Sequence, residues 1–411
     1  MRFTRGILNA FIVYLLYAGA YSFFRSTIFT VDLIYQIEVA KLNPLQLVLV
    51  GTVLETVCFL CQIPTGILAD TYSRRLAVVI GIVAVGLGFI LEGSFPSFPI
   101  ILFAQVLWGF GATCTDGAEQ AWLTDELGEE RVGAAFIQSN QADRVGSLVG
   151  TFVSVGLASI RLNLPIVFGG AGIVLLGVFL LFFMPEKGFQ KGTEGEPQSW
   201  RDLAQTFRSG LRVVRLRTVL LLILAIELMY GLASEGWDRL STAHLLKDFT
   251  FPALGSFSFV VWFAIFNVIG SLLGLAATEL VRRSVNLNNQ RQMVRVLFAS
   301  NVLVLVAVVV FALAGNFYVA VSAYLAYGVV RGAVSPIWTT WLAQNIDAKV
   351  RATVFSMMGQ MNAFGQIAGG PPVGYVGSIF SLRAALLCVG VILSPVLLLY
   401  TYALRHVQRR V

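Results

Sequence analysis

The sequence predicts an all-α polytopic membrane protein with twelve transmembrane helices. Its composition is the first reason: of 411 residues, 57% are hydrophobic and 12% are charged, and the mean hydropathy is +0.79. A soluble domain carries roughly twice that charged fraction. The second reason is that apolar runs recur along the whole chain, each long enough to cross a hydrocarbon layer of about 30 Å. The third is that the polar stretches between these runs are short, with one exception near the middle.

Apolar runs of about 20 residues mark each expected helix. They lie at 7–31, 45–69, 76–95, 99–121, 134–160, 165–184, 217–241, 255–280, 292–314, 317–341, 352–379 and 380–404. The first run continues past Ala18-Gly19-Ala20 to Val31, so we interpret it as a retained helix rather than a cleaved signal peptide. All four cysteines fall inside these runs, which argues against a disulfide framework.

Positive charges predict the orientation of the chain. If the N-terminus is cytoplasmic, only Lys41, Arg161, Lys247 and Arg383 fall in the opposite loops, although the chain has 29 Lys and Arg. The positive-inside rule therefore predicts a plasma-membrane protein with both termini in the cytoplasm. The same bias accounts for the net charge of +7, so no nucleic-acid partner is expected.

The longest polar interruption divides the chain into two halves. We expect an N-terminal six-helix bundle at 1–184, a cytoplasmic linker at 185–216 and a C-terminal six-helix bundle at 217–411. The linker begins as a solvated stretch rich in Gly, Glu and Lys. Its second part places apolar residues at helical spacing between arginines, which predicts an amphipathic helix on the anionic inner leaflet.

An internal repeat relates the two halves. At a constant offset of 219, Gly109, Trp122 and Leu123 correspond to Gly328, Trp341 and Leu342. With one residue inserted, Arg131 corresponds to Arg351 and Gly150 to Gly370. Gly66 followed by Arg74-Arg75 recurs as Gly274 followed by Arg282-Arg283. The shared order of these matches indicates a duplicated six-helix unit.

The stretch GILADTYSRR, residues 66–75, carries a family resemblance. Gly66, Leu68, Ala69, Asp70 and Arg74 match the signature G-x-L-A-D-R-x-G-R-K, whereas Thr71 and Ser73 depart from it and Arg75 replaces Lys. With twelve helices and a six-plus-six duplication, the chain resembles the major facilitator superfamily of secondary transporters. The resemblance implies two pseudo-symmetric bundles around a central cavity and transport by alternating access. The stretch DGAEQAWLTDEL looks like bacterial drug-efflux members, but the Arg and Pro motifs of the antiporter branches are absent from spans four and five.

The same stretch predicts a conformational latch made of Gly66, Asp70, Arg74, Arg75 and Asp125. Gly66 would let a neighbouring helix approach closely. Asp70 would accept hydrogen bonds from the start of the helix near Arg351, where a negative charge is favoured. Arg74 would reach the acidic end of span four at Asp125 and Glu126. The alternative is that the arginines serve only to enforce topology.

Ionisable residues inside the spans are the candidate coupling groups, because burying a charge in a membrane costs roughly 2.5–3.5 kcal/mol on insertion scales. The proton-coupling candidates are Glu55, Asp116, Glu119 and Glu227. Glu55 and Glu227 lie near the predicted midplane, where neither has an obvious partner within its own half. Asp116 and Arg144 should lie level on spans four and five, which favours a structural ion pair between them.

Aromatic and polar residues define the predicted substrate cavity. These candidates are Tyr14, Tyr17, Tyr21, Arg25, Gln138, Gln141, Arg144, Glu235, Asn267, Arg331, Trp338 and Asn362. Aromatic walls with a few carboxylates suit lipophilic or cationic molecules. The amide side chains could equally bind a sugar or a nucleoside, and each aromatic residue could instead serve helix packing.

Together these features favour a secondary transporter that exports amphipathic or cationic small molecules in exchange for protons. The alternatives are proton-coupled uptake of a polar nutrient and a transport-inactive sensor on the same fold. An enzyme is not expected: the only histidines, His244 and His406, lie in a predicted outer loop and in the C-terminal tail, and no nucleotide-binding loop is present. We expect no cofactor and no metal. The expected partners are a small-molecule substrate, protons and the lipid bilayer, with the protein acting as a monomer.

Overall fold

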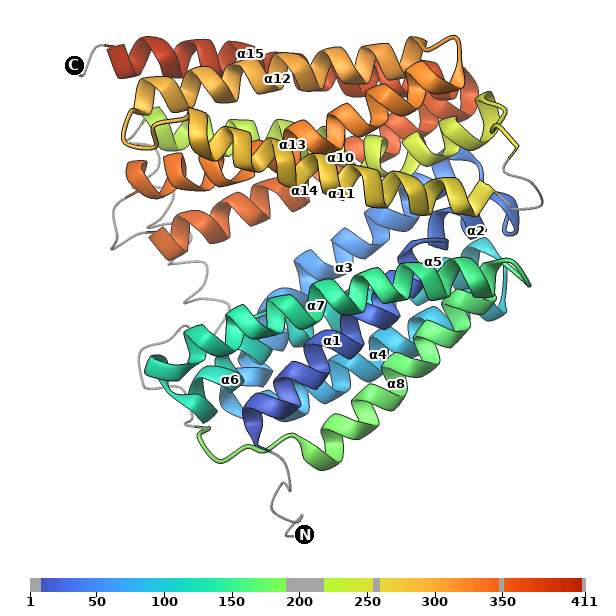
Figure 1. The fold of residues 1–411 in the computed structure, drawn as a ribbon, viewed down its shortest axis with the longest axis vertical. Helices are drawn as coiled ribbons and strands as arrows, with labels where there is room; N and C mark the ends of the chain where they lie inside the picture. Colours follow the sequence, from blue (N-terminus) through green and yellow to red (C-terminus); the bar gives the residue numbers. More distant parts are fainter. Residues whose placement is uncertain (1–8, 190–217, 254–258, 347–350, 409–411) are drawn as a thin grey trace. The chain divides into compact units, whose positions relative to one another are not determined.

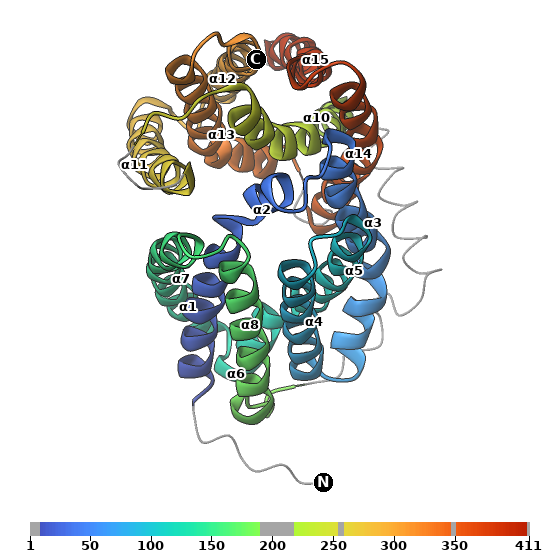
Figure 2. The ribbon, with the colours of Figure 1, turned by 90° about the vertical axis from the view of Figure 1, so that its right-hand side faces the viewer.

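The computed structural model describes residues 9–189, 218–253, 259–346 and 351–408, and every element in these ranges is a helix (Figures 1 and 2). The chain forms two compact units. Unit 1 comprises residues 1–42, 53–196 and 254–264, and unit 2 comprises residues 43–52, 197–253 and 265–411. The first turns of the second long helix therefore belong to unit 2. The predicted amphipathic helix of the linker lies outside the described residues.

Unit 1 is built around six spans, two of which are broken into a pair of helices. Its elements are α1 (Ala10–Phe29), α2 (Asp32–Glu38), α3 (Pro44–Thr71), α4 (Arg74–Ser94), α5 (Phe98–Thr115), α6 (Ala118–Leu127), α7 (Glu129–Ala158) and α8 (Leu164–Phe183). Unit 2 holds α10 (Thr218–Asp248), α11 (Phe259–Ser284) from residue 265 onward, α12 (Gln290–Leu313), α13 (Phe317–Asn345), α14 (Arg351–Ile379) and α15 (Leu382–Gln408).

The predicted all-α polytopic fold is confirmed. Ten of the segments are long and apolar enough to cross a membrane by length and composition. The other two predicted spans correspond to α7 and α14, which are long helices of lower hydropathy. In α7 the charges of Asp143 and Arg144 interrupt the apolar sequence, and α14 is rich in Gly, Gln and Asn.

Span four is broken where the sequence analysis expected one continuous helix. α5 ends at Thr115, and α6 starts after Gly117, whose φ of +76° is readily reached only by glycine. At the repeat offset, position 117 corresponds to position 336 (117 + 219 = 336), where α13 contains Pro336. Both halves thus place a helix-perturbing residue at the same point, five residues before the equivalent tryptophans Trp122 and Trp341, both of which are buried.

Glycines allow the same close helix packing in both units. A Cβ on Gly146 or Gly150 of α7 would collide with the backbone carbonyls of Gly19 or Phe23 in α1. In unit 2, a Cβ on Gly365 of α14 would lie 2.7 Å from the carbonyl oxygen of Leu228 in α10, and one on Gly369 would collide with that of Leu232.

This packing corrects one detail of the predicted repeat. Gly150 corresponds in role to Gly369, at the offset of 219, and not to Gly370. A Cβ on Gly370 would instead meet side chains of Val48, Thr52 and Glu235 within unit 2. The offset here is therefore the same as that between Trp122 and Trp341, and no inserted residue is needed between these two matches.

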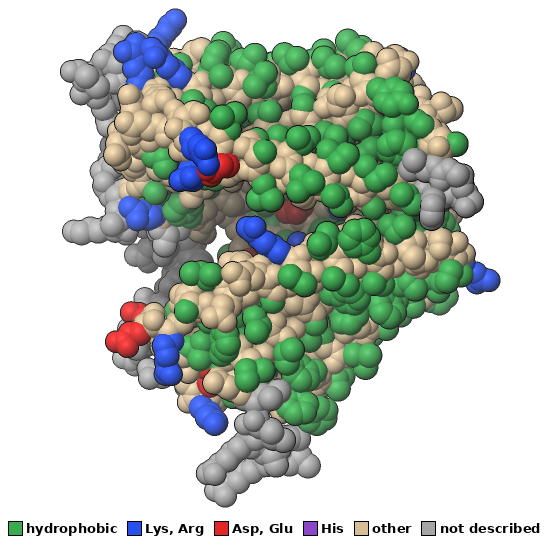
Figure 3. Space-filling model, viewed as in Figure 1, with side chains coloured by type: hydrophobic (Ala, Val, Ile, Leu, Met, Phe, Trp, Pro, Cys, Tyr) green, Lys and Arg blue, Asp and Glu red, His purple; other side chains and the backbone are tan. Residues whose placement is uncertain are grey.

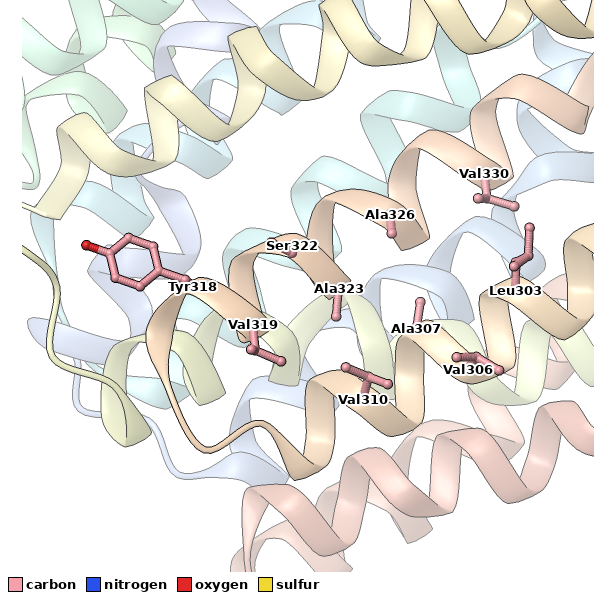
Figure 4. Close-up of a pocket in the computed structure, with 10 residues that line it drawn as sticks. All are labelled: Leu303, Val306, Ala307, Val310, Tyr318, Val319, Ser322, Ala323, Ala326 and Val330. Carbon is pink, nitrogen blue, oxygen red and sulfur yellow. The ribbon is translucent and has the colours of Figure 1, made fainter.

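The outward faces of the helices are apolar, as expected in contact with lipid. On the face shown in Figure 3, hydrophobic side chains cover the middle of the helices, and many of the charged side chains lie toward the helix ends at the left. Phe152 of α7 and Leu398 of α15 are 62% and 71% exposed. A groove of about 440 Å³ runs between α12 and α13, lined by aliphatic side chains such as Leu303 and Val330, with Tyr318 at one end (Figure 4). No charged residue lines it, so it is not the polar site that the sequence predicts.

Candidate functional site

In unit 2 a polar cluster surrounds Glu227. This residue lies in the third turn of α10. Its Oε1 accepts a hydrogen bond from the indole N–H of Trp338 on α13 at 3.1 Å. Its Oε2 accepts one from the amide of Asn362 on α14, also at 3.1 Å, and Gln366 in turn donates to Asn362 at 2.8 Å. The expectation that Glu227 lacks a partner in its own half was therefore wrong. Sequence spacing within one helix cannot reveal partners that come from two others.

Arg331 of α13 adds a positive charge to this cluster. Its guanidinium lies over the ring of Tyr230 at 4.8 Å and over that of Tyr327 at 5.7 Å, and it donates to the Tyr327 hydroxyl at 3.0 Å. Tyr230 donates to Asn301 on α12 at 2.5 Å. Arg331 also interacts electrostatically with Glu227 and with Asp238, a carboxylate on α10 that the sequence analysis overlooked. The cluster joins α10, α12, α13 and α14 through charged, aromatic and amide groups.

In unit 1 a second cluster forms around Glu119, at the start of α6. The break at Gly117 places this carboxylate in the first turn of a helix, where its negative charge is favoured. The Tyr17 hydroxyl donates to Glu119, and Gln120 donates to its other oxygen at 3.3 Å. Tyr17 also stacks on Tyr21, with ring centroids 5.7 Å apart. Tyr17, predicted to line the substrate cavity, therefore contacts a proton-coupling candidate directly.

The predicted ion pair between Asp116 and Arg144 is absent from the structure of the described residues. Both side chains are exposed within the chain. The estimate of equal depth assumed one continuous helix through span four. The break between α5 and α6 makes Asp116 the residue that ends α5, and the direction of its side chain changes accordingly.

The remaining cavity candidates are placed in three ways. Gln138 and Gln141 on α7, Arg25 on α1 and Asn267 on α11 are exposed within the chain, and Tyr14 is buried against Trp122. Glu55 is partly buried in α3. Glu235, in contrast, is buried and pairs with Arg239 one turn further along α10, at 3.4 Å. It was expected to line a cavity, and the structure shows it engaged in a helix-internal ion pair.

The signature stretch contributes to a polar network at one end of unit 1. Arg74 forms an ion pair with Asp125 on α6, as expected, and lies 3.8 Å from Asp70. Arg75 donates to the carbonyl of Leu181 at the end of α8. This contact was not predicted from the sequence, where the alternative was that the arginines only set the topology. Glu186 accepts hydrogen bonds from the Ser73 hydroxyl at 2.7 Å and from the Arg75 backbone N–H at 3.0 Å.

The close approach of a neighbouring helix at Gly66 stays a prediction. A Cβ built on this residue would meet no atom of the described residues within 4 Å. The contact expected between Asp70 and the helix near Arg351 would join the two units, and it stays a prediction.

A third polar cluster, at the opposite end of unit 1, was missed from the sequence. Gln36 of α2 donates to Asp32 at 3.2 Å and to Glu92 of α4 at 2.7 Å, and Gln105 of α5 donates to Glu92 at 3.0 Å. All four side chains are at most 2% exposed. The signal available in the sequence was Glu92, a carboxylate near the end of the apolar run 76–95. The short helix α2, which brings Asp32 and Gln36 into the cluster, left no comparable pattern.

Metal binding has no support among the residues that the structure describes, where no group of three or more His, Cys, Asp and Glu could hold an ion. The clusters instead combine carboxyl groups, neutral hydrogen-bond donors and aromatic rings within spans. Two repeated six-helix units with ionisable groups inside their spans are the architecture of a secondary transporter.

Comparison with known proteins gives the family. The chain matches the Major Facilitator Superfamily over residues 7–370 and belongs to that family of transporters. It is 22% identical over 364 residues to the uncharacterized MFS-type transporter YxaM of Bacillus subtilis (strain 168). The aligned region covers 87% of each protein. The predicted resemblance to the superfamily is thus confirmed.

Solved structures share the fold at low identity. A mutant of the nucleoside transporter NupG superposes with a TM-score of 0.74 at 15% identity, covering 96% of this chain and 99% of that one. A bacterial homolog of the human lysosomal transporter Spinster gives 0.73 at 14% identity, with 96% of each chain covered. A POT family transporter in complex with 5-aminolevulinic acid gives 0.71 at 12% identity and 95% coverage of both.

Proposed function

We propose that this transporter exports amphipathic or cationic small molecules across the plasma membrane in exchange for protons, by alternating access. The observation that carries the proposal is the environment of Glu227. This carboxyl group lies inside a membrane span, and it accepts hydrogen bonds from two neutral donors, Trp338 and Asn362. Burial in the span opposes the negative charge of this group, whereas the two N–H donors and Arg331 favour it, and this balance supports Glu227 as a group that exchanges a proton.

The aromatic surroundings of the carboxyl groups support the choice of substrate. Tyr17 and Tyr21 beside Glu119, and Trp338 beside Glu227, combine π-faces with negative charge. Such surfaces favour organic cations through stacking and cation–π contacts. We propose Glu119 and Glu227 as the coupling groups, with Glu55 and Asp116 as further candidates.

The test uses inverted membrane vesicles with a pH gradient reported by a quenched dye. Adding a lipophilic cation should restore fluorescence with the native protein and not with Glu227→Gln. The matched control is Glu279→Gln, which removes an exposed carboxylate that pairs with Arg282 and Arg283 at the end of α11. If no compound restores fluorescence although the folded protein binds lipophilic cations, proton antiport is wrong.

Uptake of a polar nutrient is the second candidate, and the amide groups favour it. Asn362 and Gln366 form a hydrogen-bonded pair next to the indole of Trp338, an arrangement that could bind a sugar hydroxyl or a nucleoside. One of the structural neighbours is a nucleoside transporter, although at 15% identity the likeness concerns the fold alone. Accumulation of a radiolabelled nucleoside by cells, abolished in Asn362→Ala, would favour uptake. A transport-inactive sensor would bind ligand but show no counterflow.

We also propose that Asp70, Arg74, Arg75 and Asp125 act as a latch on the cytoplasmic side of a monomeric protein. The Arg74–Asp125 ion pair supports this role, and the part expected of Gly66 stays a prediction. Asp70→Asn should slow transport while leaving substrate binding unchanged. Glu38→Gln, which breaks the Lys41 ion pair at the opposite end of unit 1, is the control and should leave transport intact. Equal transport rates in both variants would contradict the latch.

A further inference from the structure

His244 is a buried side chain that the transport proposal does not use. The sequence analysis placed it in an outer loop, but α10 continues to Asp248 and the imidazole is 0% exposed. The rings of Phe249 and Phe311 pack edge-on against it, with centroids 5.1 and 5.0 Å away. An aromatic enclosure of this kind excludes water from the ring.

Both ring nitrogens of His244 face acceptors. Nε2 lies 3.2 Å from the backbone carbonyl oxygen of Phe311 on α12, and Nδ1 lies 2.6 Å from Oδ2 of Asp248. A carbonyl can only accept, so Nε2 must carry a hydrogen. With that hydrogen in place, a neutral imidazole would present a bare Nδ1 to a carboxylate oxygen, and two acceptors would face each other at 2.6 Å. The contact therefore requires a proton between Nδ1 and Asp248.

Helix geometry favours the form in which His244 carries this proton. The ring lies in the last turns of α10 and against the last turns of α12, and the C-terminus of a helix stabilises a positive charge. Phe311 belongs to the final four residues of α12, and its carbonyl oxygen accepts from the Ala314 backbone N–H at 3.3 Å as well as facing Nε2. The Asp248 carboxylate, one third exposed, provides the counter-charge.

The other ionisable groups around the pair are few. Burial opposes a positive charge on the ring, and so does Arg383 at the start of α15, which also donates to the carbonyl of Ala314, just after α12. Lys247 is exposed, and Tyr318 and Tyr324 are the titratable residues in the first turns of α13. The last 18 residues of α12, from 296 to 313, contain no Asp, Glu, Lys, Arg or His.

We propose that His244 and Asp248 form a proton-binding site, separate from Glu227, that fastens the end of α10 to the end of α12. With the proton bound, the pair is an imidazolium–carboxylate pair of zero net charge. When the proton leaves to water, the Nδ1–Asp248 hydrogen bond is lost and an uncompensated carboxylate remains. The imidazole keeps its Nε2–H bond to the carbonyl of Phe311, but this bond changes from charge-assisted to neutral, so the end of α10 is held less firmly to the end of α12. The proton is thus a ligand that controls one end of unit 2, whichever solute the protein carries.

The chain offers a direct measurement, because it has only two histidines. We would label His406→Gln with ¹⁵N-histidine, so that all imidazole NMR signals come from His244. The expected spectrum at neutral pH shows hydrogens on both Nδ1 and Nε2, and one of them is lost in a single step as the pH rises. In the Asp248→Asn background the proton should be bound at least about tenfold more weakly, because a neighbouring opposite charge has been removed. A bare Nδ1 at neutral pH, unchanged by Asp248→Asn, would overturn the proposal.

A second measurement tests the fastening itself and does not depend on activity. Backbone hydrogen exchange of the segment around His244 is compared between the native protein and His244→Gln at each pH, so that intrinsic exchange chemistry cancels. The ratio of native to variant rates should rise across the pH at which the NMR signal shows proton loss. His244→Gln cannot hold the charge, so it should show no such step. A constant ratio across the titration would refute control of α10 by the proton.

Discussion

At the scale of single residues, Glu186 shows how a side chain just outside a span can stabilise one. Its carboxylate accepts from the Ser73 hydroxyl and the Arg75 backbone N–H, at the N-terminus of α4. We predict that Glu186→Ala lowers the free energy of unfolding by about 1 kcal/mol, the usual contribution of a helix N-cap. Glu186→Gln should lose less, because the amide oxygen still accepts.

Thermal unfolding in detergent measures this effect. Glu130→Ala is the matched control: it removes an exposed carboxylate from the first turn of α7 that forms no side-chain hydrogen bond or ion pair with the described residues. If Glu186→Ala and Glu130→Ala unfold at the same temperature, the cap contributes nothing measurable.

The residue-level predictions from sequence succeeded where local spacing sets the contact. Arg74 and Asp125 lie at the ends of helices that the spans already defined, and their ion pair could be expected. Glu186 was missed because its contact requires the chain after α8 to turn back toward α4. His244 was missed because Asp248, one helical turn later, continues α10 past the apolar run.

At the scale of helices, the packing of α7 on α1 depends on small residues. A side chain at Gly150 would overlap the backbone carbonyl of Phe23, and backbone can move little in a packed bundle. We predict that Gly150→Val destabilises the protein by about 1–3 kcal/mol, the typical cost of overpacking. Gly156→Val on the same helix is the control, because a Cβ there meets no described atom within 4 Å. The amount of monodisperse protein after a heat challenge distinguishes the two variants, and equal losses would refute the close approach.

The break in span four predicts a second helix-level effect. Gly117 has a φ of +76° and a ψ of −33°, which an L side chain adopts only with strain. Gly117→Ala should cost about 1–3 kcal/mol of stability. Gly133→Ala, at a helical position of α7 with open space around it, should be neutral or slightly stabilising. Thermal unfolding of both variants checks this prediction. If Gly117→Ala unfolds at the same temperature as the native protein, an L residue adopts this backbone conformation without strain.

Helix positions could be predicted closely from hydropathy, since apolar length is a strong constraint on a membrane span. The expected run at 45–69 became α3 at Pro44–Thr71, and that at 165–184 became α8 at Leu164–Phe183. Hydropathy does not report the break at Gly117 or the kink between α1 and α2, because it reflects composition and not backbone conformation. The Asp116–Arg144 ion pair was wrongly predicted because the depth of Asp116 was estimated from a continuous helix.

At the scale of the whole molecule, the distribution of charge predicts a topology. Twelve spans, an even number, place both termini on the same side of the membrane, and the positive-inside rule makes that side cytoplasmic. Lys41 lies between α2 and α3, and Lys187 follows α8; both side chains are exposed. They should therefore lie on opposite sides of the membrane. We predict that a membrane-impermeant maleimide added to intact cells labels Lys41→Cys but not Lys187→Cys, and that permeabilisation makes Lys187→Cys reactive. The unsubstituted protein, whose four cysteines lie within helices, gives the background. The reverse labelling pattern would place the signature stretch outside the cell, and with it both the cytoplasmic latch and the direction of the proposed export would be wrong.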